Sequence, residues 1–310
     1  MAKRLISKIT QKSTKIKRNI LLKNYTTFNI GGPAKYFTEA NTKKDIIEAV
    51  KWAKEKKLPF FVLGGGSKLL IADEGFDGLV IKIQNSKIKT KKEKSKIKIL
   101  AEAGIPLAEL VLKTLEVGAT GLEWARGIPR ATLGGAIRGN AGAFEKEIAD
   151  IIEEVEVLDT KDLKTKTFKN KDCQFGYRES IFKKSNNLII LSARLQFKKG
   201  SKKEILNQIE WHLNYRKEHH PFDFPSAGSI FKNPPNFPAG KLITDCGLKG
   251  KTIGKVQISE KHANFIINLG GGKAKEVKKL IKIAREKVKN SFGIQLQEEL
   301  QYLKENKVKF

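Results

Sequence analysis

Hydrophobic positions recur along the chain with two different periods, and each period predicts its own set of elements. The patterns predict helices over residues 45–56, 106–117, 202–217 and 275–290. Short apolar or alternating runs predict strands over residues 59–63, 78–83, 96–101, 152–158 and 188–197. Residues 23–40, with Gly31, Gly32 and Pro33, are interpreted as a turn-rich entry. Strands and helices without regular βαβ alternation favour an α+β architecture with a boundary near Gly200.

The composition indicates an ordinary soluble chain. Its 310 residues leave room for two domains, and no apolar run approaches the roughly 18 residues that a membrane span needs. The first 20 residues are basic but lack the apolar core and cleavage site of a secretory signal, so we expect a cytoplasmic protein. A basic organelle-targeting segment is the alternative. Cys173 and Cys246 lie in no CxxC pattern, and the four histidines lack carboxylates at ligand spacing, so we expect no metal site.

The net charge of +28, from 61 Lys and Arg against 33 Asp and Glu, raises the question of nucleic-acid binding. The lysines are spread over the whole chain, and aromatic residues are not interleaved with them as a single-strand binder requires. We therefore expect no specific nucleic-acid binding. The positive field would still attract an anionic substrate such as a nucleotide sugar.

Two glycine-rich stretches lie next to apolar strands. The first is Gly64, Gly65, Gly66 and Ser67, whose backbone N–H groups can converge on an anion without side chains in the way. It is no Rossmann fingerprint, because the glycine spacing fails at Leu69. The second stretch covers residues 127–143 and has few bulky side chains, which permits close approach of a flat ring or a pyrophosphate. A plain tight turn and close packing of chain segments are the alternatives.

Two further segments carry polar groups suited to chemistry. Arg178 offers a planar, permanently charged fork that fits a carboxylate, although a surface arginine is the alternative. In residues 225–234, small residues surround Ser229 beside Lys232 and Asn233, a set that suits proton delivery and anion contact. A hydroxyl-rich turn is the alternative there. His262 either contacts a substrate or caps the strand that follows it.

Taken in order, these segments resemble the UDP-N-acetylenolpyruvoylglucosamine reductase family. The similarity runs from residue 24 to residue 303 and rests on residues 24–32, 63–67, 127–129, 134–136, 140–142, 175–180, 226–234, 257–265 and 296–299. Each motif is modest, and the order and spacing of all nine make the combination specific.

The resemblance implies an FAD-binding domain of the vanillyl-alcohol-oxidase type over residues 24–199, a smaller α+β substrate domain over residues 200–304, and a basic extension over residues 1–23. It implies NADPH as the electron donor, UDP-N-acetylglucosamine enolpyruvate as the substrate and a monomer that holds FAD without a covalent bond. The implied catalytic residues are Arg178, Ser229 and Glu299. The implied FAD contacts are Gly64, Gly65, Gly66, Ser67, Gly127, Gly134, Gly135, Asn140 and Gly142. The implied substrate contacts are Tyr177, Lys232, Asn233, Gln257 and His262.

The chain departs from the family's pattern at several positions. Lys68 stands where asparagine is usual and adds charge near the expected pyrophosphate; Arg130 stands where glycine is usual, and Phe144 and Glu145 where an aromatic-glycine pair is common. Arg130 and Glu145 are therefore expected at positions of positive φ. The short span between Arg178 and residue 188 leaves no room for an extra substrate-capping loop. Two alternatives stay open: a flavin-dependent oxidase of the same fold acting on another substrate, and a basic nucleic-acid-binding or structural protein.

Overall fold

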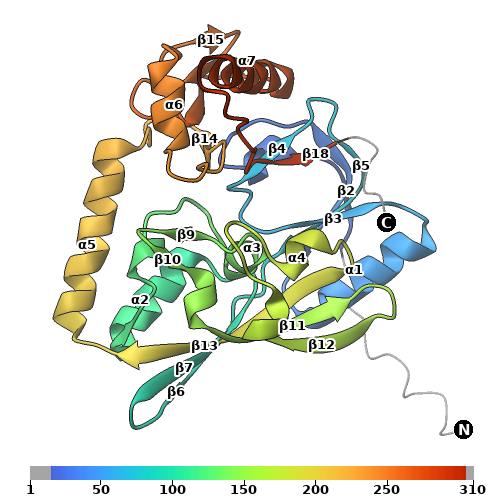
Figure 1. Ribbon diagram of the computed structural model, residues 1–310. Helices are drawn as coiled ribbons and strands as arrows, with labels where there is room; N and C mark the ends of the chain where they lie inside the picture. Colours follow the sequence, from blue (N-terminus) through green and yellow to red (C-terminus); the bar gives the residue numbers. More distant parts are fainter. Residues whose placement is uncertain (1–14, 305–310) are drawn as a thin grey trace, which may run out of the picture.

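The computed structural model describes residues 15–304, which form two sheet-based units below and a third above them (Figure 1). The first unit is a four-stranded sheet in the order β1 (Lys17–Leu21), β2 (Pro33–Ala40), β5 (Phe76–Ile83) and β3 (Phe60–Leu63). β5 pairs in parallel with both β2 and β3. Helix α1 (Lys43–Glu55) packs on β2 and β5, and the side chain of its N-cap residue, Thr42, accepts a hydrogen bond from the N–H of Asp45.

The second unit is an antiparallel sheet in the order β12 (Lys164–Lys169), β11 (Ile152–Asp159), β13 (Leu188–Lys199), β7 (Lys96–Glu102) and β6 (Ile88–Lys92), with β8 (Ala119–Thr120) on the far end of β13. Its helices are α2 (Leu107–Val117), α3 (Leu133–Arg138) and α4 (Ile181–Lys184). α2 ends at Gly118, whose φ of 74° is the left-handed conformation that suits glycine. A hairpin of β9 (Gly142–Ala143) and β10 (Lys146–Glu147) follows α3.

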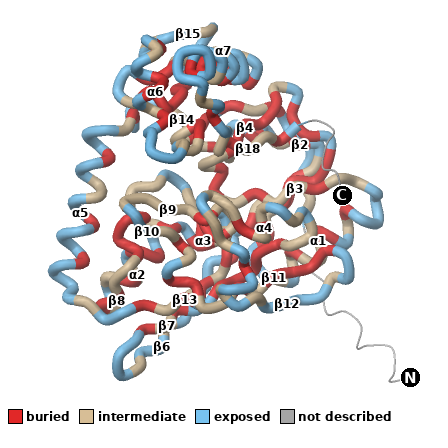
Figure 2. The backbone as a smooth tube through the Cα atoms, viewed as in Figure 1, coloured by how far each residue is buried: buried red, intermediate tan, exposed pale blue. Residues whose placement is uncertain are grey.

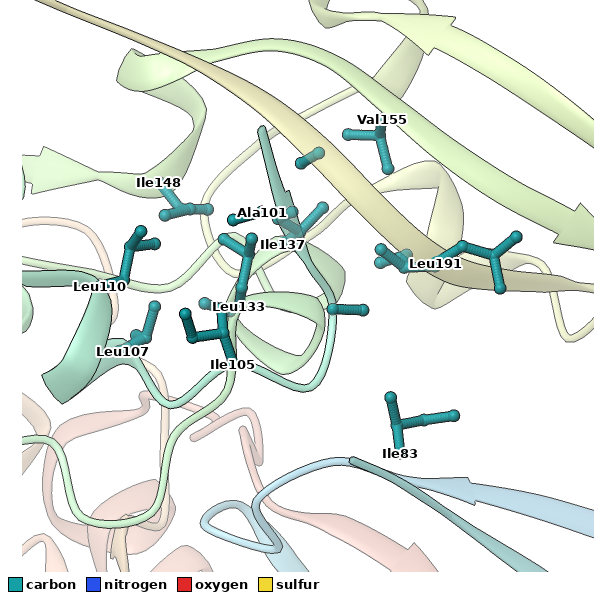
Figure 3. Packing of buried hydrophobic residues seen from close by; sticks show 14 of the residues in the cluster. Ile83, Ala101, Ile105, Leu107, Leu110, Leu133, Ile137, Ile148, Val155 and Leu191 are labelled. Atoms are coloured by element: carbon teal, nitrogen blue, oxygen red, sulfur yellow. The ribbon is translucent and has the colours of Figure 1, made fainter. Parts of the chain in front are cut away.

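One hydrophobic core joins these two units. Figure 3 shows Leu133 and Ile137 of α3 projecting among Leu107 of α2, Ala101 of β7 and neighbouring apolar side chains, all of them buried. Burying a leucine or isoleucine completely stabilises the fold by about 1.5–3 kcal/mol. The apolar face of α3 therefore fixes the second glycine-rich stretch, within which the helix lies, onto the core.

Helix α5 (Lys202–His219) leads from the lower units to the third one. Figure 2 shows it exposed along most of its length, and its buried residues are Ile205, Ile209 and Arg216. The third unit is a small antiparallel sheet in the order β14 (Ser226–Ser229), β17 (Phe265–Asn268), β16 (Val256–Ile258) and β15 (Thr252–Ile253). Helices α6 (Ala239–Asp245) and α7 (Ala274–Phe292) complete it.

The end of the described chain returns to the first unit. β18 (Gln301–Leu303) pairs in parallel with β4 (Leu69–Ile71), directly after the first glycine loop. The core of the third unit accordingly contains Phe28, Ile30 and Leu70 from the N-terminal part of the chain. Single-turn 3-10 helices occupy Leu22–Tyr25, Glu123–Ala125, Ile148–Ile151 and Asn170–Cys173.

The four predicted helices and five predicted strands are confirmed, as is the α+β class. The turn-rich entry is wrong over Pro33–Ala40, which forms β2 with alternating burial inside the sheet. The 1–23 extension also needs correction: residues 1–14 lie outside the described residues, but Lys17–Leu21 is strand β1, antiparallel to β2. Between residues 15 and 304, no helix is long and apolar enough to cross a membrane.

Candidate active site

The two glycine-rich stretches, predicted as separate cradles, are packed against each other. A Cβ atom at Gly65 would lie 1.5 Å from the carbonyl oxygen of Arg130, and one at Gly64 would lie 2.8 Å from Thr132 Oγ1. Gly66 has a φ of 68° and meets the backbone of Tyr25. These glycines are thus required because other backbone segments pack closely against them. This packing joins residues 64–67 and residues 127–143 into one surface.

The first loop nevertheless keeps donors for a ligand. Within residues 15–304, the N–H groups of Gly65, Gly66 and Ser67 donate to no protein acceptor, although Gly65 and Gly66 are buried. Buried N–H groups need an acceptor, and phosphate oxygens supply one. Lys82 lies behind the loop with Nζ 2.8 Å from the carbonyl oxygen of Gly64, and burial, with Arg130 nearby, lowers the pKa of its ammonium to about 8. The loop therefore fits the pyrophosphate of a dinucleotide such as FAD.

The other predicted cofactor contacts have varied surroundings. A Cβ atom at Gly134 would lie 2.9 Å from that of Ala103, and one at Gly142 would lie 2.4 Å from the carbonyl oxygen of Lys146. Gly135 faces Thr132 Oγ1, and Gly127 faces Leu213 of α5. The side chain of Asn140 is buried, donates to Gly176 O and accepts from the N–H of Ala149. The Asn140 side chain therefore ties the second glycine-rich stretch to Ala149 and Gly176, and its contact with a cofactor stays a prediction.

The predicted positive φ angles are confirmed. Arg130 has a φ of 53° and Glu145 a φ of 58°, and Phe144 beside it has 54°. For residues other than glycine this conformation costs roughly 1–2 kcal/mol each. The loops next to the predicted cofactor surface are therefore strained by the substitutions that distinguish this chain.

Arg178, Ser229 and Glu299 come from three distant segments and meet at one place. Ser229 ends β14, and the carbonyl oxygen of the next residue, Ile230, accepts a hydrogen bond from the N–H of Glu299 at 2.8 Å. Arg178 Nε lies 3.4 Å from Glu299 Oε1, and their side chains are only 19% and 16% exposed. Among the described residues the Ser229 hydroxyl has no hydrogen-bond partner, so it is available to a ligand.

Arg178 is held in a strained conformation. Its φ is 58°, its Nη2 donates to Gly142 O at 2.6 Å, and its Cζ lies 4.9 Å from the centre of the Tyr177 ring. Backbone strain of this kind persists only where surrounding contacts impose it, and it gathers at functional sites. The guanidinium thus has a fixed orientation between the β9–β10 hairpin and Glu299.

Three of the five predicted substrate contacts lie around this group. The Tyr177 hydroxyl accepts a hydrogen bond from the N–H of Asn233 at 3.3 Å, which links the second unit to the third. The Asn233 side chain accepts from the N–H of Ala239, and Lys232 Nζ lies 2.7 Å from Glu179 Oε1. Lys232 and Asn233 follow Ser229 closely, so these polar groups line the same junction.

Gln257 and His262 are not brought to this group by any contact. The Gln257 amide donates to Gly250 O and Thr252 Oγ1 within the third unit. His262 Nδ1 accepts the N–H of Asn264 at 3.2 Å, just before β17, and burial lowers the pKa of its ring. These contacts match the capping alternative for His262.

Sequence reasoning did not assign two residues that shape the site to it. Lys68 reaches Ser229 and Glu299, whereas it was expected near the pyrophosphate. Asn264 is buried and holds Phe231 by both backbone groups, with its Oδ1 and Nδ2 each 2.9 Å from their partners. Asn264 therefore fixes the end of the strand that carries Ser229; its only sequence signal was its place in a motif of the resemblance.

A cavity of about 900 Å³ lies elsewhere, lined by residues that include Lys23, Asn29, Asp73, Phe224 and Gly271. It contains none of the residues predicted to be catalytic. The junction of Arg178, Ser229 and Glu299 is the better candidate because it combines fixed charges, a free hydroxyl and the neighbouring glycine surface.

Comparisons with known proteins show which family the chain resembles. The family model described as UDP-N-acetylenolpyruvoylglucosamine reductase, C-terminal domain, matches residues 220–303, and an FAD binding domain model matches residues 34–165. The reductase of Caldanaerobacter subterraneus subsp. tengcongensis is 39% identical over 98% of this chain and 100% of its own length. That of Caldicellulosiruptor bescii is 42% identical over 92% of this chain and 89% of its own.

The chain belongs to the UDP-N-acetylenolpyruvoylglucosamine reductase family. The crystal structure of the Thermus caldophilus reductase covers 93% of this chain and 99% of its own, with a TM-score of 0.79 and 35% identity. The fold is thus the expected FAD-binding domain followed by the family's C-terminal domain. The family models fall on either side of α5, and we retain the domain boundary near Gly200 as a proposal.

Proposed function

We propose that this member of the reductase family uses FAD and NADPH to reduce UDP-N-acetylglucosamine enolpyruvate to UDP-N-acetylmuramate, a step of peptidoglycan synthesis. The observation that carries the residue assignment is the convergence of Arg178, Ser229 and Glu299 beside the glycine surface. The surface around Gly65, Gly66 and Ser67 would hold FAD, which would supply the hydride chemistry that links NADPH to the substrate. The net reaction adds one hydride and one proton across the double bond of the enol ether.

The substrate's carboxylate is the group that the protein has to hold. Negative charge moves onto it when hydride adds to the terminal vinyl carbon. The guanidinium of Arg178 has a fixed orientation and can pair with this negative charge. Because the Arg178 side chain is mostly buried, such a pair is stronger there than in water. Glu299, 3.4 Å away, orients that fork and lies beside the carboxylate.

Ser229 is the proposed proton donor to the carbon that bears the carboxylate. Its hydroxyl is free of protein partners in the described chain, and its backbone is held between β17 and the segment of Glu299. A serine is a weak acid, so it depends on the basicity of the charged intermediate. Tyr177, Lys232 and Asn233 are proposed to bind the rest of the nucleotide sugar.

The experiment is anaerobic spectroscopy of the purified protein. We expect a yellow protein that NADPH bleaches and that the enolpyruvyl nucleotide recolours, with UDP-N-acetylmuramate as the product. A protein that is reduced by NADPH but reoxidised only by oxygen would overturn the substrate assignment. A folded protein that stays colourless after FAD is added would overturn the flavin assignment.

We further propose that the chain acts as a monomer in the cytoplasm and binds no nucleic acid specifically. The high positive charge makes the last point worth a direct test. In filter binding, weak retention of DNA that disappears in moderate salt without sequence preference is expected. Tight, sequence-dependent retention would contradict it.

A further inference from the structure

Lys68 lies where the first glycine loop, Ser229 and Glu299 come together. Its Nζ donates to the carbonyl oxygen of Ser229 at 2.9 Å and lies 3.4 Å from Glu299 Oε1. Its own carbonyl oxygen accepts the N–H of Gln301 at 3.0 Å, so its backbone is fixed by the chain that carries Glu299. A Cβ at Gly228, the residue before Ser229, would lie 3.3 Å from the ammonium, so the ammonium packs directly against the backbone of the β14 end.

Two cations thus share one carboxylate oxygen, because Arg178 Nε also lies 3.4 Å from Glu299 Oε1. Arg178 and Glu299 alone carry no net charge as a pair. With Lys68 the group carries one net positive charge, at side chains that are at most 31% exposed. The net positive charge therefore attracts the carboxylate of an incoming ligand, although the carboxylate of Glu299 lies in the same site.

We propose that Lys68 is a positioning and specificity residue for the substrate's carboxylate. It holds the peptide that carries the Ser229 hydroxyl, and it offsets Glu299 so that the Arg178 fork remains available to a second carboxylate. The inference rests on the proposed function of this site. It assigns to Lys68 a preference for ligands that carry an acid group, beyond affinity for nucleotide sugars in general.

The test compares two ligands that differ in the enolpyruvyl group. Dissociation constants are measured on the oxidised holoenzyme, without turnover, for UDP-N-acetylglucosamine enolpyruvate and for UDP-N-acetylglucosamine. In Lys68→Met we expect affinity for the enolpyruvyl nucleotide to fall about tenfold, as for loss of one charge-assisted contact, with little change for the other ligand. Lys68→Arg keeps the charge and should restore most of the preference.

Lys113→Met is the matched control, since it removes the same charge from a lysine that is 31% exposed, like Lys68, and pairs with Glu116 on α2 outside the junction. An equal loss of affinity for both ligands in Lys68→Met would mean that Lys68 merely supports the fold. No loss of affinity for either ligand would mean that Lys68 does not contribute to ligand binding. Both outcomes overturn the inference. A wild-type holoenzyme that does not prefer the enolpyruvyl nucleotide would instead count against the proposed function, so the two failures are distinguishable.

Discussion

Arg178 and Glu299 meet with Nε 3.4 Å from Oε1, although one lies between β12 and β13 of the second unit and the other precedes the last described strand. The pair exists because β18 returns to β4 and the segment before β18 pairs with the end of β14. A guanidinium from the second unit is thereby placed against the Glu299 carboxylate, whose backbone N–H in turn bonds to the carbonyl oxygen of Ile230, next to Ser229. The relative position of the two units decides whether the site is complete.

Replacing Arg178 by lysine should lower kcat/KM for the enolpyruvyl nucleotide about a hundredfold. A point charge replaces a planar fork, so both the contact with Gly142 O and the two-pronged grip on a carboxylate are lost. Stopped-flow reoxidation of the reduced protein by substrate measures this. Arg194→Lys, at an exposed pair with Glu154, is the control and should change nothing. Unchanged reoxidation in Arg178→Lys would remove Arg178 from the proposed mechanism.

Replacing Ser229 by alanine should leave the reduction by NADPH intact and slow reoxidation by substrate about a thousandfold, as for loss of a general acid. The two half-reactions are measured separately under anaerobic conditions. Glu299→Gln should act in the same direction and less severely. Ser226→Ala, on the same strand, is the control. If both half-reactions slowed equally in Ser229→Ala, the proton-donor role would be wrong.

The long periodic elements could be predicted from the sequence because their burial repeats. α7 buries Val277, Leu280, Ile281, Ala284 and Val288 on one face, which the 3.6-residue period reveals. β17 is buried on both faces over Phe265–Asn268 and β14 consists of small residues, so neither shows alternation. These short strands of the third unit were missed for that reason.

The site could be predicted only through the resemblance. The pairing of β18 with β4 joins residues that are distant in sequence, and no local pattern reports it. The same pairing decides the direction of Lys68, whose side chain reaches Glu299 across the junction. The sequence shows that Lys68 adds a positive charge next to the first glycine loop, but it does not show that Glu299 is the ion-pair partner of Lys68.

Arg216 of α5 anchors the loop that precedes Gly127. It is buried, its Nη1 and Nη2 donate to Arg126 O and Trp124 O at 2.8 and 2.7 Å, and burial lowers the pKa of its guanidinium to about 10. Arg216→Met should leave two carbonyl groups without donors and lower the free energy of unfolding by about 3 kcal/mol. Urea unfolding measures this, with flavin fluorescence as a second signal.

Because Gly127 packs against Leu213 and Arg216, flavin release in Arg216→Met should precede the loss of helical signal. Arg216→Lys, which retains a charge but cannot reach both carbonyls, should fall between the variant and the wild type. Coincident flavin release and unfolding at the wild-type midpoint would contradict the anchoring role.

Glu145→Gly should stabilise the protein. Glu145 has a φ of 58°, which glycine adopts without steric cost, and the gain should be about 1 kcal/mol after the greater freedom of the unfolded chain is subtracted. The midpoint temperature of thermal unfolding should rise by about 2 °C. Lys146→Gly, at the neighbouring position in strand β10, should move it downward, because glycine gains nothing there and weakens the strand. Two shifts of the same sign would contradict the assignment of strain to residue 145.

His220 should make the fold sensitive to acid. Burial, together with the charges of His262, Arg216, His219 and Lys261, lowers the pKa of its ring to about 4, against about 6.5 in an unfolded chain. Between these two pH values the ring binds a proton in the unfolded chain but not in the folded protein, so the free energy of unfolding falls as the pH drops from about 6.5 to 4.

The variant His220→Phe tests this, because it keeps an aromatic ring against Phe265 and cannot titrate. Urea unfolding at a series of pH values should find the wild type losing up to about 3 kcal/mol relative to this variant by pH 4, with a constant difference above pH 7. Parallel curves over the whole range would remove His220 as the cause.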